Sequence, residues 1–157
     1  MNIASLIKDC LFDHWSETNP TAAKITWKYD EFDPKNPSLQ VLIENFPQRS
    51  TWVIRGVYRV EHRARITVYL KLVRYELDNI ENSRTTWFNA KVEIDKILDK
   101  NKFSIPGIVN LNLSGGWDDK NTIAVGRGMK TRREPIVWQT EQIVTAQYYI
   151  DEELVGE

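Results

Sequence analysis

A run of β-forming residues, from position 51 to position 74, constrains the fold more than any other feature of this sequence. Most of its residues are β-branched, aromatic or arginine, and the first two types favour extended backbone. In its second half, apolar residues alternate with basic or polar ones, as expected for an antiparallel strand with one exposed face. The apolar set is Ala64, Ile66, Val68, Leu70 and Leu72, and the opposite set is Arg63, Arg65, Thr67, Tyr69 and Lys71. We predict two strands, over 51–60 and 63–75, for which one arrangement is a hairpin with a bulge. Gly56 and the charged cluster 61–63 would mark a bulge or bend.

The same two-residue period predicts further strands over 24–29, 38–46, 109–114 and 136–150. Between the first two of these, residues 30–37 contain two prolines, which cannot donate to a ladder, so we expect a loop there. Together with the long run, these strands predict a mostly antiparallel sheet.

Two segments, 3–17 and 83–100, show the 3.6-residue period of an amphipathic helix. Asn2 is a suitable N-cap for the first helix, and Asn19-Pro20 would end it. Cys10 lies beside the apolar stripe of this helix, where a small buried hydrophobe is its expected role. The apolar residues are Ile3, Leu6, Ile7, Leu11, Phe12 and Trp15 in the first helix, and Trp87, Ala90, Ile94, Ile97 and Leu98 in the second.

Helices separated by antiparallel strands predict an α+β fold in which both helices pack on one sheet. We expect a single domain over residues 1–150, followed by an acidic tail over 151–157. Residues 115–134 are Gly-rich and basic without apolar periodicity, which predicts a long mobile loop. Long polar loops of this kind often bind partners, so this loop is the first candidate for function.

Composition and charge narrow the class of protein. The chain has 157 residues, of which 41% are hydrophobic and 27% charged, as in an ordinary globular domain. With 21 basic and 22 acidic residues, the formal net charge is -1, which excludes attachment to DNA or membranes by gross charge alone. Cys10 is the only cysteine, which excludes an intramolecular disulfide and a cysteine-based zinc site. We find neither a secretory signal nor a bilayer-spanning apolar run, so we expect a protein made in a reducing cytoplasm.

No pattern in the sequence indicates catalysis, and we expect neither enzymatic activity nor a cofactor. The two histidines, His14 and His62, do not specify a metal site, and we expect both at the surface. The acidic residues at 30–33 and 118–119 lack the spacing of a calcium-binding loop. The fragment GMKT at 128–131 resembles the end of a phosphate-binding loop but lacks the first glycine of that motif.

Two stretches of the chain are basic. Residues 49–74 hold seven Arg or Lys against one Glu, and residues 120–134 hold five against one. Aromatic residues lie between the basic ones of the first stretch, and such residues stack on bases in single-strand binders. They are Trp52, Tyr58, Tyr69 and Tyr75. The alternative is a solvated or protein-binding sheet face, on which long aliphatic stems cover the aromatic rings.

The order of elements is similar to that of the tail terminator and tail completion proteins of long-tailed phages and related archaeal viruses. Three passages carry the resemblance: the helix IASLIKDCLFDHW, the strand pair from SLQVLIENF through RARITVYLKL, and TTWFNAKVEIDKIL followed by VNLNLSGGW. The segment PIVWQTEQIVTAQYYI is similar to the closing strand of that fold. The long 115–134 loop and the acidic tail depart from the pattern of the family.

The resemblance implies a structural subunit that assembles as a homo-oligomeric ring, usually a hexamer, on the head-proximal end of a tail tube. Such a ring stops tube polymerisation, and its partners are the tail tube protein and the head connector proteins. The protein would then lie in the tail of the virion, after assembly in the host cytoplasm. Candidate residues for the oligomer or tail-partner interface are Trp117, Ile123, Met129 and Trp138. Candidate DNA-facing residues, whose contacts would be independent of sequence, are Arg63, Arg65, Lys71, Arg127, Lys130, Arg132 and Arg133.

The alternative function is a small nucleic-acid-binding module that uses the basic, aromatic-rich strand face. The distribution of charge is compatible with either function. Residues 49–74 and 120–134 together hold 12 of the 21 basic residues and 2 of the 22 acidic ones, a net charge of +10, which leaves -11 for the remaining residues. Such polarity suits head-to-tail assembly between like subunits, or a ring with one charged wall.

Overall fold

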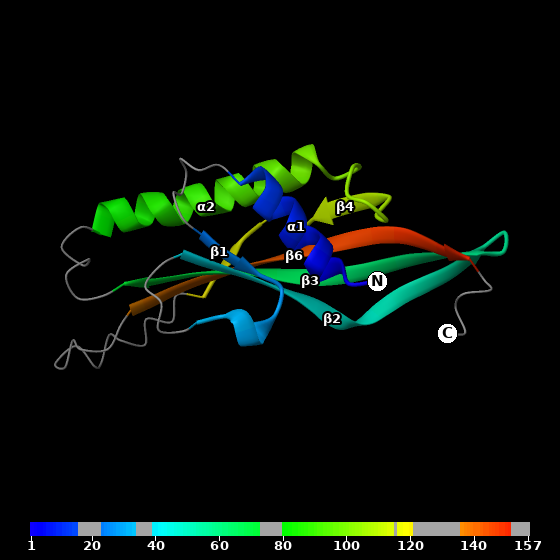
Figure 1. The fold of residues 1–157 in the computed structure, drawn as a ribbon, viewed down its shortest axis with the longest axis horizontal. Helices are drawn as coiled ribbons and strands as arrows, with labels where there is room; N and C mark the ends of the chain where they lie inside the picture. Colours follow the sequence, from blue (N-terminus) through cyan, green and yellow to red (C-terminus); the bar gives the residue numbers. More distant parts are fainter. Residues whose placement is uncertain (16–22, 34–38, 73–79, 115, 121–135, 152–157) are drawn as a thin grey trace.

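The fold is α+β, as the sequence predicts. Its computed structural model describes residues 1–15, 23–33, 39–72, 80–114, 116–120 and 136–151. Within these residues, the helices α1 (Ile3–His14) and α2 (Ile80–Lys100) lie on one side of a sheet, and the 3-10 turn η1 (Tyr29–Glu31) lies on the other (Figure 1). None of the helices in this part of the chain is both long and apolar enough to cross a lipid bilayer.

One sheet joins the described parts of the chain, and β3 lies at its centre. The strands, in their order across the sheet, are β1 (Ala23–Thr26), β2 (Leu39–Ile54), β3 (Val57–Leu72), β6 (Ile136–Asp151) and β4 (Asn110–Leu113), and β5 (Asp118–Asp119) also pairs with β6. Neighbouring strands are antiparallel except for β1 and β2, which are parallel. The sheet is therefore mixed, although its three 16-residue strands form an antiparallel centre.

In the longest β-forming run of the sequence, the strands begin and end at other residues than predicted. β2 runs from the predicted strand 38–46 into the predicted strand 51–60, and the chain turns at Arg55 and Gly56. Gly56 therefore belongs to a hairpin turn rather than to a bulge, and the cluster 61–63 pairs regularly with β6. Both turn residues have positive φ, 51° for Arg55 and 80° for Gly56, as in the two-residue turns that match the twist of a hairpin.

The bulge of this hairpin lies in β2. Between Asn45 and Arg49, β2 has two more residues than the facing segment of β3. Pro47, which has no amide hydrogen, falls inside this bulge, where the ladder is interrupted. The His62 side chain is 9% exposed, and its Nε2 lies 2.7 Å from the carbonyl oxygen of Phe46. The prediction of a surface position is therefore wrong for His62, a buried residue of β3 that contacts the bulge of β2.

Both helices bury most of the faces that their periodicity predicts, but Phe12 of α1, predicted on the apolar face, is 65% exposed. The buried residues are Ile3, Ala4, Ile7, Cys10 and Leu11 of α1, and Trp87, Ala90, Ile94, Ile97 and Leu98 of α2. The large apolar side chains among them contribute roughly 1.5–3 kcal/mol each to folding. They share one hydrophobic cluster with the inner face of the sheet.

The predicted cap of α1 is present and is fixed to the sheet. Asn2 Oδ1 accepts a hydrogen bond from the amide of Ser5 at 3.1 Å. Asn45 of β2 accepts a hydrogen bond from the amide of Ala4 at 2.7 Å and donates one to Asn2 at 2.9 Å. These bonds satisfy amides at the start of the helix that have no partner within it. They also place α1 next to the bulge.

The sheet face opposite the helices is only partly exposed. The Phe32 ring, just after η1, lies 4.6 Å from the ring of Tyr69. The side chain of Gln40 bonds both backbone groups of Asp33, at 2.9 and 2.6 Å. Gln40 and Thr67 are each only 2% exposed. The polar face predicted for β3 is therefore buried in part and is not uniformly solvated.

We expect Cys10 to be unreactive in the folded protein. Burial raises the pKa of its thiol from 9.0, and the charge of Asp13 raises it further, to about 11. At about pH 8, the reactive thiolate should then be about a hundredfold scarcer than in the unfolded chain. Alkylation with iodoacetamide, in native buffer and in concentrated urea, measures this difference, and equal rates would contradict it. Because the unfolded thiol ionises first, stability should also fall as the pH rises from about 9 towards 11.

Candidate functional site

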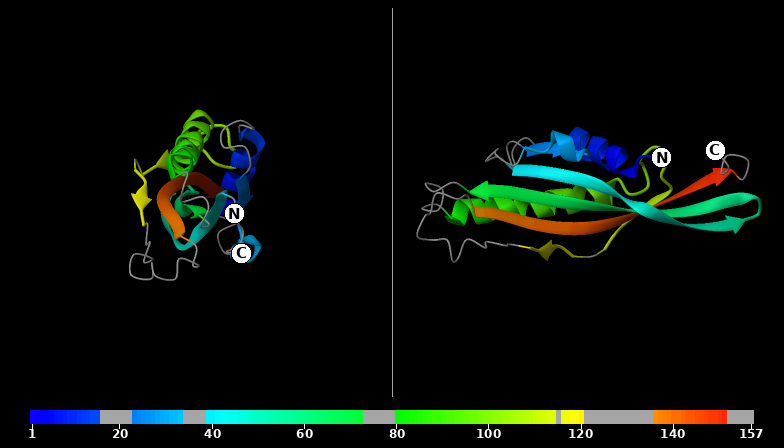
Figure 2. Two further views of the ribbon diagram at one scale, coloured as in Figure 1. Left: turned by 90° about the vertical axis from the view of Figure 1, so that its left-hand side faces the viewer. Right: turned by 90° about the horizontal axis from the view of Figure 1, so that it is seen from below.

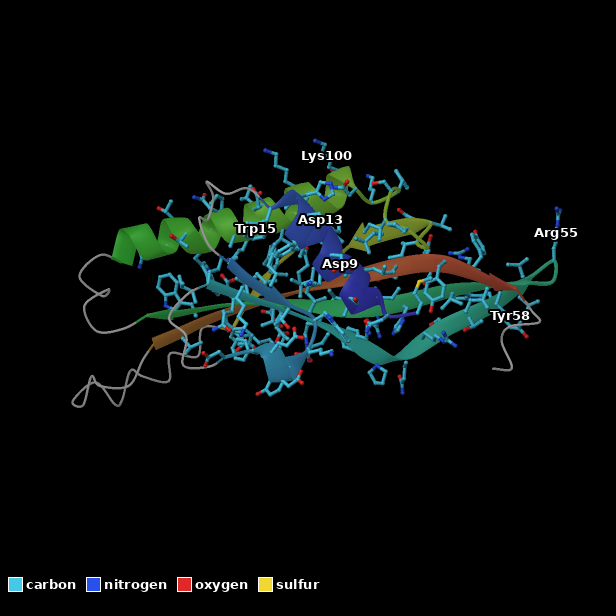
Figure 3. The ribbon with its side chains drawn as sticks, viewed as in Figure 1. Asp9, Asp13, Trp15, Arg55, Tyr58 and Lys100 are labelled. Carbon is cyan, nitrogen blue, oxygen red and sulfur yellow. The ribbon has the colours of Figure 1, made fainter. Side chains whose placement is uncertain are left out.

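A three-stranded arm extends beyond the helices. It consists of residues 49–61, which flank the β2–β3 turn, and residues 147–151 at the end of β6. The right view of Figure 2 shows these strands running past both helices. In Figure 3, Arg55 and Tyr58 lie near the far end of the arm, away from α1 and α2.

Aromatic and aliphatic side chains of the arm are open to solvent. Trp52 is 46% exposed, Val53 is 59% exposed and Tyr149 is 52% exposed. In the strand register, Trp52 faces Arg59 and Arg59 faces Tyr149, so these three residues form a row on one face. The guanidinium of Arg59 lies 5.4 Å from the centre of the Trp52 ring. Tryptophan, tyrosine and arginine in such clusters are the residues most enriched at the energetic centres of protein–protein interfaces.

The two edges of the arm have no neighbouring strand among the described residues. β1 pairs with β2 only as far as Leu42, and β4 and β5 reach no further than Gln147 of β6. Unpaired edges present free backbone donors and acceptors, which folded proteins usually block or cover. An edge of this kind can bind a strand of another chain.

The neighbours of β3 neutralise part of its predicted basic face. Arg65 forms an ion pair with Glu44 of β2 at 3.1 Å. On the same face, burial raises the pKa of Tyr69, and the negative charges of Glu44 and Glu141 raise it further. Glu44 and Glu141 therefore add negative charge to a face that β3 alone indicates as basic.

Of the predicted DNA-facing residues, the structure brings Arg63 and Arg65 together. Their guanidinium groups lie 5.1 and 5.8 Å from the centre of the Phe46 ring, and Arg63 is exposed. Lys71 is near the end of β3, where the backbone but not the side chain is described. The remaining candidates, which lie outside the described residues, are Arg127, Lys130, Arg132 and Arg133, together with the interface candidates Ile123 and Met129.

The two tryptophans predicted at an interface make contacts within the chain. The indole Nε1 of Trp117 donates to both carboxylate oxygens of Asp95 in α2, at 3.1 and 3.0 Å. The buried side chain of Gln142 donates to Asp95 Oδ1 at 2.6 Å. Trp138 is 6% exposed, and its ring meets that of Trp87 edge-on at 5.8 Å. Trp138 therefore lies in the core of a single chain, whereas Trp117 fastens the β5 region to α2.

The segment 115–134, predicted as one long loop, begins with a short strand. β5 pairs with β6, and Lys91 of α2 lies 2.8 Å from the carboxylate of Asp119. The loop prediction is therefore wrong at its start, and the part from residue 121 onward lies outside the described residues.

A groove of about 280 Å³ lies between α1 and the chain that follows α2. Asp9 and Asp13 lie on its α1 side, and Figure 3 shows both on the body of the molecule, far from Arg55. The other lining residues are Leu6, Cys10, His14, Asn101, Ser104, Ile105 and Pro106. No cluster of three or more potential metal ligands occurs in the part of the chain that the structure describes.

Sequence reasoning missed the arm because it placed the strand boundary at residues 61–63. The signal for the correct boundary was the glycine at position 56, between two alternating runs. Arginine is uncommon beside glycine in a turn that needs two positive φ angles, so the turn was not evident. With the boundary misplaced, the sequence does not predict that Trp52, Val53 and Tyr149 lie on the same arm.

No protein-family model and no curated protein matches the sequence. The function is therefore inferred from the geometry of the chain and from the resemblance of its layout.

We expect the tip of the arm to respond in opposite directions to two substitutions. Gly56→Ala should lower the free energy of unfolding by about 1 kcal/mol, because a Cβ disfavours positive φ. Arg55→Asn should raise it by about 0.5–1 kcal/mol, because asparagine tolerates the left-handed region better. Urea unfolding of both variants measures the change. A neutral Gly56→Ala variant would show that the turn has a different conformation.

The carboxylate of Asp95 should be essential for stability. Asp95→Ala leaves the buried amide of Gln142 and the indole of Trp117 without their acceptor, and should cost about 1–3 kcal/mol. The matched control is Asp99→Ala, because Asp99 is on the same helix but is 70% exposed, and its ion pair among the described residues is with Lys102 at 3.4 Å. This control should change stability by less than about 0.5 kcal/mol. Equal effects of the two substitutions in urea unfolding would contradict the assignment.

Proposed function

We propose that this protein is a structural subunit of a viral tail, which assembles into a ring that caps the tail tube and joins it to the head connector. The observation that carries the proposal is the arm. It projects from a well-packed body, and it exposes Trp52, Val53 and Tyr149 between two unpaired edges. A surface of this kind promotes aggregation of an isolated chain, and it forms a stable interface when a partner covers it.

A contact between different surfaces of like subunits favours a ring. Arg55 lies at the far end of the arm (Figure 3), and the groove on the body is lined by Asp9 and Asp13. If the arm of one subunit binds the groove of the next, the interface is head-to-tail, and such interfaces close into rings when the rotation allows it. Opposite charges on the two surfaces support this pairing over arm-to-arm contact.

The backbone of Arg55 adds support for a role of the arm tip in binding. A φ of 51° is unfavourable for arginine, and strained residues of this kind tend to occur where a side chain is needed for function. Glycine or asparagine would fit the turn better. An arginine at the far end of the arm is consistent with selection for contact with an acidic surface.

The assembly is proposed to be a viral tail because the order of elements resembles that of tail terminator and tail completion proteins. Nucleic-acid binding along the whole β3 face has weaker support, because Arg59 and Arg65 form ion pairs with Glu61 and Glu44. Such pairs reduce the net positive charge that a phosphate backbone requires.

The ring is tested by light scattering and negative-stain imaging of the purified protein, with and without tail tubes. We expect rings or tube-capping complexes for the wild type. The double variant Trp52→Ser, Tyr149→Ser should weaken assembly at least about tenfold, because interface tryptophan and tyrosine residues often contribute 2 kcal/mol or more.

The matched control is Phe88→Ser, since Phe88 is 63% exposed but lies on α2, away from the arm. This variant should assemble as the wild type does. Monomers alone at high concentration, with no binding to tail tubes, would refute the proposed function. Rings that persist in the double variant would refute the role of the arm and leave the ring itself standing.

A further inference from the structure

The groove between α1 and the chain that follows α2 is suited to a positively charged group. Asp9 and Asp13 lie one helical turn apart on α1, so both carboxylates stand on the same side of the helix at the groove. The opposite wall begins at Asn101, directly after the last turn of α2, and the last carbonyl groups of a helix carry partial negative charge. The neighbouring lysines, Lys100 and Lys102, are not among the lining residues.

The carboxylate of Asp13 keeps its charge at this groove. In the described part of the chain, Asp13 forms no ion pair, whereas Asp9 lies 3.4 Å from Lys8. Burial, and then the negative charge of Asp13, raise the pKa of the Cys10 thiol, which lines the same groove. The ring of His14 is held by its Nδ1, 2.9 Å from the carbonyl oxygen of Cys10. The negative charge of Asp13 therefore acts inside the groove.

The groove also offers apolar surface beside its carboxylates. Leu6, Ile105 and Pro106 line it, and the first two belong to or pack against the hydrophobic core. Phe103, which follows the lining residue Asn101 by two positions, is 70% exposed. A partner that fits this groove has a cationic group next to an apolar side chain. Arginine is the better cation here, because its guanidinium is weakly hydrated and binds carboxylates through two parallel hydrogen bonds.

The tip of the arm has this combination. Arg55 is exposed and forms no ion pair with any described residue. Val53, two residues earlier, is 59% exposed. It lies opposite Tyr58 and therefore on the face of the arm that continues the helix side of the sheet, where Val60 joins the core. The tip thus presents a cation and an apolar side chain that no part of its own chain covers.

Within one chain the two surfaces do not meet. Figure 3 shows Asp9 and Asp13 on the body of the molecule and Arg55 at the far end of the arm. A contact between them therefore needs a second copy of the chain. Complementary charge favours this partner over the pairing of two arm tips, in which one Arg55 would face another.

We infer that the arm tip of one subunit binds the α1 groove of the next, with the guanidinium of Arg55 on the carboxylates of Asp13 and Asp9. Val53 then packs towards the apolar lining of the groove. The inference rests on the proposed ring, for which it names the contact that joins neighbouring subunits. Every subunit uses its arm on one neighbour and its groove on the other, as a head-to-tail interface requires.

Charge reversal in the full chain tests the contact. Arg55→Asp and Asp13→Arg should each weaken self-association at least about tenfold, because each places like charges at the interface. Sedimentation velocity, with and without tail tubes, measures the loss. The matched controls are Lys24→Asp and Asp30→Arg, which make the same charge changes at exposed residues of β1 and η1. These controls should assemble within about twofold of the wild type, and circular dichroism verifies the fold of every variant.

A mixture of the two reversed variants gives the decisive result. In an alternating assembly, the unchanged arm of Asp13→Arg meets the unchanged groove of Arg55→Asp, and the two reversed surfaces meet each other. Every contact is then complementary, so the equimolar mixture should assemble although neither variant does so alone. The chain that carries both substitutions should assemble by itself for the same reason.

The outcomes separate this contact from the ring. If Arg55→Asp and Asp13→Arg assemble like the wild type, the ring stands and the inferred contact is wrong. If both variants are monomeric and neither the mixture nor the double variant regains assembly, Arg55 and Asp13 do not face each other, and the inference is overturned. A wild type that stays monomeric at high concentration and does not bind tail tubes would overturn the ring and the contact together.

Discussion

The pairing of β3 on both of its edges is the constraint on which the rest of this structure depends. β6 meets β3 at all 16 of its residues, although the two strands are far apart in sequence. β2 covers most of the opposite edge. This pairing aligns the apolar faces of three strands under α1 and α2, and it also continues beyond the helices to build the arm. Because the same ladders run through body and arm, the arm is held in a fixed direction even where no helix covers it.

The charge of the outer face follows from this pairing and not from β3 alone. Along β3, arginines alternate with apolar residues, so the strand looks basic when taken by itself. The register places Glu44 beside Arg65 and brings Glu141 onto the same face. Among the described side chains of this face, Arg63, opposite the bulge, forms no ion pair with a carboxylate. Three strands contribute side chains to this face, so the charges along one strand do not determine the charge of the whole face.

Features set by local periodicity could be predicted from the sequence, and features set by distant pairing could not. The two helices, the Asn2 cap, the buried Cys10 and the α+β class all follow from spacing within short segments. The buried position of His62 depends on a bulge in another strand, and β5 depends on the free edge of β6. The burial of Trp138 depends on Trp87, which comes from α2. The arm was missed for the same reason, because Trp52 and Tyr149 are brought into one row only by Arg59 between them.

The bulge shows how a strand accommodates a local irregularity without harming the core. Side chains of a strand alternate between faces, so one extra residue would move every later side chain of β2 to the wrong face. The bulge between Asn45 and Arg49 holds two extra residues, an even number, so the alternation is kept. Trp52 therefore stays on the outer face with Arg59, as Leu42 does with Thr67 at the other end of the hairpin. The extra length is taken up between these ends, where residues 46–48 of β2 lie opposite the single residue Arg63 of β3.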